Sequence, residues 1–282
     1  MKVRYPSQAG TFYHASASNL EDQIKGCFLH RLGPGRTPTE RVRRPRNLIA
    51  AVAPHAGYMY SGPTAAHLYL GLAEEEKAET VIILGPNHTG FGSAVSTDTE
   101  GAWRTPLGDV QIDADSAKKI VAASQVIDID ESAHRYEHSI EVQLPFLQFI
   151  YGDFKFVPIC MMMQDLETSR EIGEAIAEAT SGKSCLVMAS SDLTHHESQA
   201  SANRKDRMVI DAALAMDEGK LQTVVERNRI SMCGYGPVSA AIVAARLMGA
   251  QTAGLLSYKT SGDITGDMSY VVGYASIAFS KQ

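Results

Sequence analysis

The chain has 282 residues, of which 44% are hydrophobic and 21% are charged, and these values are near the average for a folded globular protein. This composition excludes disordered, collagen-like and disulfide-scaffold proteins, and the length suits one α/β domain over residues 1–282. The net charge is −6 and the sequence has no long blocks of one sign, so its charge does not indicate binding to nucleic acid or to an anionic membrane.

The sequence predicts no secretory or membrane-spanning segment. The first residues lack the apolar stretch of a signal peptide, no apolar run approaches about 18 residues, and the four cysteines stand far apart. We therefore expect a cytoplasmic protein. One local basic cluster, which runs from Arg36 to Arg46 and includes Arg41, is expected to be a solvated loop.

Short apolar runs rich in β-branched residues alternate along the chain with stretches of helical periodicity. This alternation predicts an α/β fold, with a central, mostly parallel or mixed sheet that is flanked by helices. The predicted strands are residues 47–54, 80–86, 155–162, 184–190, 251–257 and 270–279, and residues 103–112 are predicted to form a hairpin or an excursion from the main sheet. The predicted helices are residues 64–76, 114–124, 137–151, 169–180, 200–216, 220–227 and 237–248.

Two prolines mark helix boundaries. Pro145 lies inside the predicted helix 137–151, where it lacks an N–H group and would clash with the carbonyl four residues back. We therefore expect that helix to kink or break near Glu141. Pro237, in contrast, suits the first position of the last helix, where a missing N–H costs nothing.

Histidines follow three of the predicted strands. His55 lies in PHAGYMYSG, His88 in GPNHTG and His195 in SSDLTHH. Because ligands of open α/β sheets bind outside the carboxyl ends of the strands, these imidazoles are expected to converge. Neutral imidazole is the commonest protein metal ligand, so the sequence predicts a metal site with His55 and His88 as ligands.

Such a site also needs an anionic ligand, and three side chains are candidates: Asp192, Glu141 and Cys233. Cys233 precedes the helix that begins near Pro237, where the helix dipole favours a thiolate that can bind a metal or attack a substrate. It could equally be a small packed side chain. The residues alone leave this choice open.

Four further side chains are candidates for acid–base catalysis. His138 and Glu141 are three residues apart in EHSIEVQLPFLQ, so a helix would place them on one face. Asp192 precedes His195 by three residues, a spacing that suits a carboxylate that orients an imidazole base. The alternative is that these four side chains have no catalytic role and are ordinary polar residues of a helix and a loop.

The chain resembles the Memo family, named after the animal mediator of ErbB2-driven cell motility and known in prokaryotes from the AmmeMemoRadiSam system. The resemblance extends from residue 4 to residue 237. It is carried by the segments RYPSQAGTFY, APHAGYMYSG, ILGPNHTG, EHSIEVQLPFLQ, SSDLTHH and MCGYGP.

The resemblance implies a fold similar to that of class III extradiol dioxygenases, which bind non-haem Fe(II) through two histidines and a glutamate. It implies that His55 and His88 are the histidine ligands, that His195 matches the position of the base, and that His138 matches a position beside the ligands that does not bind the metal itself. In Memo proteins a cysteine takes the place of the third ligand, which matches Cys233. A soft thiolate shifts the metal preference toward copper(I), zinc or a differently poised iron, so ring cleavage does not follow from the fold.

Three functions follow from these observations. The first is a metal-dependent oxidoreductase with Fe(II), or with copper or zinc, that acts on a small organic substrate. The second is a non-catalytic scaffold that binds a peptide or a phosphorylated partner in the same pocket. The third is a hydrolase or transferase with Cys233 as nucleophile and His195 as base. The resemblance also implies radical S-adenosylmethionine and AMMECR-type proteins as pathway partners.

Overall fold

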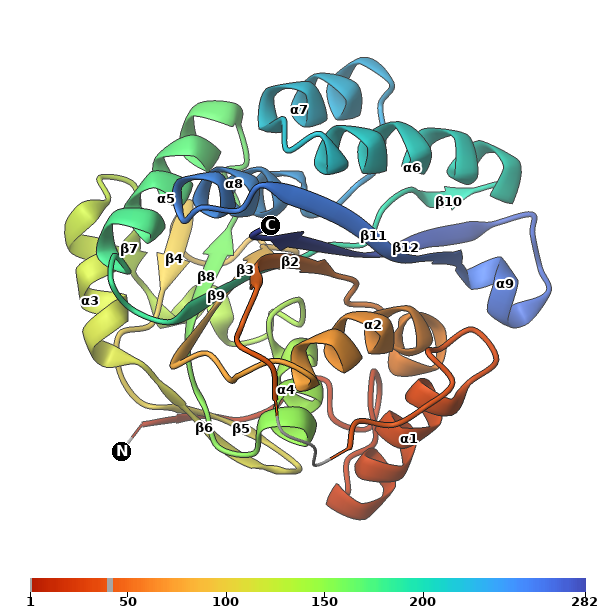
Figure 1. Ribbon diagram of the computed structural model, residues 1–282, viewed down its shortest axis with the longest axis horizontal. Coiled ribbons are helices and arrows are strands. Elements are labelled where there is room, and N and C mark those ends of the chain that lie inside the picture. The colour runs from red at the N-terminus through yellow and green to blue at the C-terminus, as the bar shows by residue number, and fades with distance from the viewer. Residues whose placement is uncertain (1, 40–42) are drawn as a thin grey trace.

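The computed structural model describes residues 2–39 and 43–282, and its centre is a twisted mixed sheet with helices on both faces (Figure 1). The strands are β1 Val3–Arg4, β2 Leu48–Ala53, β3 Thr80–Pro86, β4 Val95–Thr97, β5 Ala102–Thr105, β6 Gly108–Ile112, β7 Asp128–Ile129, β8 Lys155–Met161, β9 Cys185–Ser190, β10 His195–Glu197, β11 Thr252–Thr260 and β12 Val271–Ser280. The α-helices are α1 Ala17–Leu29, α2 Tyr58–Ala73, α3 Ala114–Ala123, α4 Leu144–Tyr151, α5 Leu166–Ala179, α6 Gln199–Leu214, α7 Glu218–Arg227, α8 Tyr235–Leu247 and α9 Ser261–Thr265, and 3₁₀ turns cover η1 Glu131–His134 and η2 Glu141–Gln143.

The middle of the sheet is parallel. Strands β8, β3, β9 and β2 lie side by side in that order and all run in the same direction. Every residue of β2, β3 and β9 is buried, which explains why these strands are almost continuously apolar in sequence. Antiparallel β12 borders β2, and β11 pairs with β12. The predicted α/β fold with a mostly parallel, mixed sheet is therefore confirmed.

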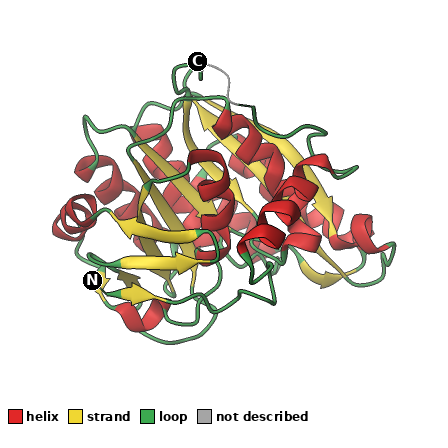
Figure 2. Cartoon of the chain, turned by 90° about the horizontal axis from the view of Figure 1, so that it is seen from below, coloured by secondary structure: helices red, strands yellow, loops and turns green. Residues whose placement is uncertain are grey.

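Helices cover both faces of this sheet. Figure 1 shows α5, α6, α7 and α8 on one side and α1, α2 and α4 on the other. The short strand β1 pairs with β5 at one margin of the sheet, and Figure 2 shows the N-terminus beside these short strands. The hairpin predicted at residues 103–112 is formed by β5 and β6, and β6 extends the main sheet by pairing with β8.

Helix α2 begins six residues earlier than the predicted start at residue 64. Pro63, which directly precedes the predicted start, lies inside the helix. Residues that precede the helix stabilise its first turn. The Tyr58 amide donates to the Phe12 carbonyl, and the Ser61 hydroxyl donates to the Ala56 carbonyl. Helix α1 was not among the predicted helices.

The predicted helix 137–151 breaks as expected, but it also starts later. Residues 137–140 are not helical, the 3₁₀ turn η2 follows, and α4 begins at Leu144. Pro145 therefore lies in the first turn of α4, where its missing N–H leaves no intrahelical bond unmade.

The arginine cluster is less solvated than the sequence predicted. Arg43 donates to the Ile150 carbonyl and Arg46 donates to the Leu48 carbonyl, so both side chains tie the segment to the body of the protein. Arg36 pairs with Glu74 on the surface. Arg41 lies outside the described residues.

Within residues 2–39 and 43–282, no helix is long and apolar enough to cross a membrane.

Candidate metal centre

The loops that follow three neighbouring parallel strands meet at one edge of the sheet. Strand β9 lies between β3 and β2, and the loops after these strands carry His88 (β3), Asp192 (β9) and His55 (β2). Cys233 approaches the same point from the segment before α8. The predicted convergence at the carboxyl ends of the strands therefore holds for His55 and His88.

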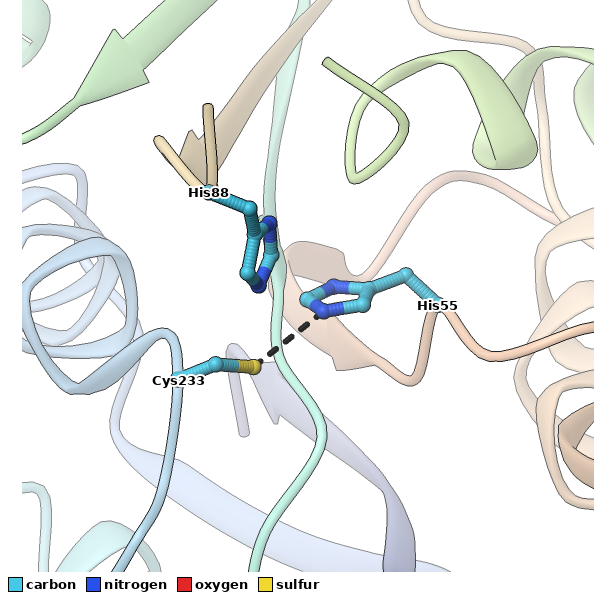
Figure 3. Close-up of side chains that lie close together, drawn as sticks. All are labelled: His55, His88 and Cys233. Atoms are coloured by element: carbon cyan, nitrogen blue, oxygen red, sulfur yellow. Dashed lines mark hydrogen bonds between the residues drawn. The ribbon is translucent and has the colours of Figure 1, made fainter. Parts of the chain in front are cut away.

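His55, His88 and Cys233 form a group that could hold a metal ion. One potential ligand atom from each of the three side chains lies within 4.8 Å of the others. Figure 3 shows the two imidazole rings and the sulfur facing a common point, with 3.1 Å between Cys233 Sγ and His55 Nε2. Ligand atoms about 2.0 to 2.3 Å from one tetrahedral ion lie roughly 3.3 to 3.8 Å apart, so small side-chain movements would suffice. Two imidazoles and a thiol are also a chemically suitable donor set for a transition metal.

A buried carboxylate that the sequence reasoning missed, Glu137, orients His88. Glu137 Oε1 lies 2.9 Å from His88 Nδ1, and Oε2 accepts the His88 backbone amide. Burial opposes ionisation of Glu137, but its hydrogen bonds with His88 outweigh this effect and lower the pKa of Glu137 to about 2. An ionised carboxylate can only accept, so His88 carries its proton on Nδ1 and turns the Nε2 lone pair toward the metal group.

The substitution Glu137→Gln should therefore weaken metal binding about 10- to 100-fold. The carboxylate accepts the amides of His138 and Ser139 besides both His88 donors, and an amide NH₂ would face one of these donors. Chelator competition with Zn²⁺ measures the effect. Glu218→Gln is the matched control, because that buried carboxylate pairs with arginines of α5 and α8 away from the metal group. Equal affinity in both variants would refute the assigned role of Glu137.

Cys233 is a half-buried thiol next to a neutral imidazole. Burial raises the pKa of the Cys233 thiol and lowers the pKa of His55 well below its usual value. The free pair is therefore a thiol and a neutral imidazole, rather than a thiolate with an imidazolium. A cation would displace the thiol proton and gain a thiolate ligand. This pairing also bears on the nucleophile hypothesis, because the imidazole that contacts the sulfur is that of His55, whereas the hypothesis invoked His195.

The metal group opens on a cavity of about 400 Å³. His138 and His195 line this cavity together with His55, His88 and Asp192. Apart from Thr11, the rest of its wall is apolar or aromatic, and includes Phe12, Met59, Tyr60 and Val272. The cavity thus combines polar groups near the metal position with walls that could contact an organic molecule.

Asp192 and His195 are not paired as the sequence predicted. Asp192 Oδ1 accepts the backbone amide of His55 at 2.8 Å, so Asp192 holds the loop that carries a metal ligand. His195 Nδ1 instead lies 2.8 Å from the Ser231 carbonyl. A carbonyl can only accept, which places the His195 proton on Nδ1 and leaves a lone pair on Nε2. The group that orients His195 is therefore the Ser231 backbone, 36 residues away in sequence.

His138 and Glu141 do not share a helical face, because helix α4 begins only at Leu144. The His138 ring stacks on the His88 ring, with centroids 4.5 Å apart, and lines the cavity. Burial is the main reason that the pKa of His138 falls to about 4. His138 is therefore neutral at pH 7 and can donate or accept a hydrogen bond beside His88.

Glu141 points toward the N-terminal segment and does not line the cavity, so the structure does not place it for the expected acid–base role. Its two carboxylate oxygens are occupied by donors of that segment, namely the Arg4 guanidinium, the Ser7 amide and hydroxyl, the Gln8 amide and the Tyr13 hydroxyl. Glu141 is completely buried. The carboxylate therefore anchors the segment that contributes Phe12 to the cavity wall.

Comparisons with known proteins identify the family of this chain. The model of the family described as Memo-like protein matches residues 4–278. A MEMO1 family protein of Methanopyrus kandleri is 54% identical over 281 residues, which cover 99% of each chain. MEMO1 family proteins of Methanocaldococcus jannaschii and Sulfolobus acidocaldarius are 50% and 46% identical and cover 98% of this chain, and 98% and 99% of their own lengths.

One solved structure supports the fold. A crystal structure of an uncharacterised protein from Escherichia coli K12 matches with a TM-score of 0.56, over 82% of this chain and 99% of that chain. The sequence identity is only 12%, so the similarity concerns the fold alone.

Proposed function

The chain belongs to the Memo-like protein family, and from this premise we propose that it is a metal-dependent oxidoreductase that acts on a small organic molecule. The proposed ligands are His55, His88 and Cys233, and the proposed metal is Fe(II), with copper as the alternative. One observation carries the proposal: potential ligand atoms from three separate segments meet within 4.8 Å beside a cavity of about 400 Å³.

The donor set fits a catalytic ion better than a structural one. Three protein ligands leave coordination positions open, whereas structural zinc sites are closed by four. When bound, such an ion would supply Lewis acidity and electron transfer to molecules in the cavity. Zinc would supply only the first of these, so the proposed redox function requires iron or copper.

The chain's own residues would bind and orient the substrate and move its protons. His195 Nε2 carries a lone pair on the cavity wall and can accept a proton as general base. Neutral His138, stacked on His88, can hydrogen-bond a substrate oxygen. Phe12, Met59 and Val272 would contact the apolar part of the substrate and exclude water.

The cavity is less suited to a phosphorylated partner. Among the described residues that line it, none is a lysine or an arginine. Proteins usually recognise phosphate with arginine clusters, so a phosphopeptide would lack its usual partner on the protein side. This observation argues against a phosphorylated partner and leaves an unmodified peptide as the alternative occupant.

Oxygen consumption tests the proposed activity. Protein reconstituted with Fe(II) is mixed with a panel of catechols and other phenols, and we expect turnover above that of free iron. His195→Gln should lower turnover about 100- to 10,000-fold with bound iron unchanged, because the general base is lost. His196→Asn is the control, since this exposed neighbour has a φ of 62°, which asparagine tolerates.

No turnover across the panel with Fe(II), or with copper in a parallel experiment, would contradict the enzyme proposal. Binding of a peptide partner that survives chelation and His88→Ala would favour the scaffold instead.

A further inference from the structure

We propose that Gln143 and Ser190 fix the tautomer of His55, so that its proton stays on Nδ1 and its Nε2 lone pair faces Cys233. Both are positioning residues that act through His55. The consequence for metal affinity rests on the proposed metal site, but the tautomer is a property of the metal-free chain.

A backbone carbonyl sets the orientation of the Gln143 side-chain amide. Gln143 Nε2 lies 3.0 Å from the Pro54 carbonyl oxygen, which can only accept a hydrogen bond. The NH₂ end of the Gln143 side chain must therefore face Pro54. The opposite end is consistent, because the Tyr69 hydroxyl donates to Gln143 Oε1. Two groups on either side thus define the orientation of this buried amide.

The second hydrogen of the Gln143 amide goes to Ser190. Gln143 Nε2 donates to Ser190 Oγ at 2.8 Å. Ser190 Oγ in turn lies 2.6 Å from the Ser139 carbonyl, a second group that can only accept. The single hydroxyl hydrogen of Ser190 is therefore directed to Ser139.

His55 must then act as a donor toward Ser190. His55 Nδ1 lies 2.9 Å from Ser190 Oγ, whose one hydrogen is already used by Ser139. The hydroxyl oxygen can accept two hydrogen bonds, one from Gln143 and one from His55, and its capacity is then complete. The proton of neutral His55 consequently lies on Nδ1, and the Nε2 lone pair faces Cys233 Sγ at 3.1 Å.

Burial of the hydrogen-bonded groups strengthens the preference of His55 for one tautomer. His55, Gln143, Ser139 and Ser190 each have at most 2% of their surface exposed, so bulk water cannot readily replace a lost partner. The wrong tautomer would leave a buried acceptor facing another acceptor, which is costly. The two histidines are therefore oriented by different devices, a carboxylate for His88 and a neutral relay for His55.

Nitrogen-15 NMR of the histidine rings in the metal-free protein at pH 7.5 tests the tautomer directly. We expect His55 to be protonated at Nδ1 in the unmodified chain, with its resonances assigned by comparison with His55→Gln. Protonation at Nε2, or an even mixture of tautomers, would overturn the proposal. This measurement needs neither bound metal nor activity.

The substitution Ser190→Ala tests the relay. Without the hydroxyl acceptor, we expect the Nε2-protonated form of His55 to rise and Zn²⁺ affinity to fall about 10- to 100-fold in chelator competition. Ser276→Ala is the matched control, because this buried hydroxyl on β12 also donates to a backbone carbonyl, that of Thr64. An unchanged tautomer in Ser190→Ala would overturn the role of the relay.

The two proposals fail in different ways. If the unmodified chain shows the expected tautomer but binds neither Zn²⁺ nor Fe²⁺, the proposed metal function fails and the tautomer assignment stands. If Zn²⁺ binds tightly but His55 is protonated at Nε2 in the metal-free chain, the relay fails and the metal site stands.

Discussion

Replacing Glu141 by leucine is expected to lower the free energy of unfolding by about 3 to 5 kcal/mol. The substitution leaves the Arg4 guanidinium without its carboxylate, in a side chain that is only 11% exposed. It also removes the acceptor for two backbone amides, those of Ser7 and Gln8. Breaking a buried ion pair by removing one partner is far more costly than losing an exposed pair. Urea denaturation measures the difference.

Glu131→Gln is the control for this prediction. Glu131 also pairs with a basic residue of the N-terminal segment, Lys2, but its side chain is 50% exposed. We expect its loss to change stability by no more than about 1 kcal/mol. A Glu141→Leu protein of nearly unchanged stability that binds metal but has lost turnover would contradict the anchoring role. That result would restore the acid–base role that the sequence predicted for Glu141.

The variants Cys233→Ser and His55→Ala are expected to lower metal affinity more than about 100-fold. Loss of a residue that only hydrogen-bonds to a metal ligand lowers affinity by about 10- to 100-fold, and loss of the ligand itself should cost more. Each removes one of three direct ligands, and serine replaces a soft donor with a hard hydroxyl that stays protonated at neutral pH. Chelator competition with Co²⁺ measures affinity, and a sulfur-to-cobalt charge-transfer band reports the thiolate. We expect this band to disappear in Cys233→Ser.

Cys185→Ala is the matched control, since this buried cysteine begins β9 at the end of the strand opposite the metal group. Loss of the charge-transfer band in Cys185→Ala, or its persistence in Cys233→Ser, would show that another sulfur binds the ion. Equal affinity in all variants would contradict the proposed ligand set.

Much of the fold could be predicted from the sequence because burial leaves a local signature. The central strands β2, β3 and β9 are buried along their whole length, so they appear as short apolar runs bounded by polar or turn residues. Helix starts were harder to place. The structure starts α2 at Tyr58 because the Phe12 carbonyl, 46 residues earlier, accepts the Tyr58 amide. Local periodicity contains no information about such a contact.

The residues of the candidate site also fall into those that could be predicted from the sequence and those that could not. His55 and His88 were predictable because the carboxyl ends of parallel strands meet at one edge of a sheet. Glu137 and Ser190 were missed, since they act across 49 and 135 residues of sequence on His88 and His55. The choice of Cys233 over the carboxylates came from the family resemblance, because the residues alone left three candidates open.

The misplacement of Glu141 has an identifiable cause. The spacing of His138 and Glu141 suggested a shared helical face, but the helix starts only after both residues. The partners of Glu141 are in the RYPSQAGTFY segment, which the resemblance highlighted without a role. In the structure, Glu141 anchors this segment, and the segment places Phe12 in the cavity wall.

X-ray absorption spectroscopy of the metal-loaded protein tests the central claim most directly. For zinc-loaded protein, we expect one sulfur ligand at about 2.3 Å and two nitrogen ligands at about 2.0 to 2.1 Å, with light atoms completing the coordination. The sulfur contribution should vanish in Cys233→Ser and persist in Cys185→Ala. A spectrum that contains only nitrogen and oxygen ligands in the unmodified protein would contradict a metal centre formed by His55, His88 and Cys233.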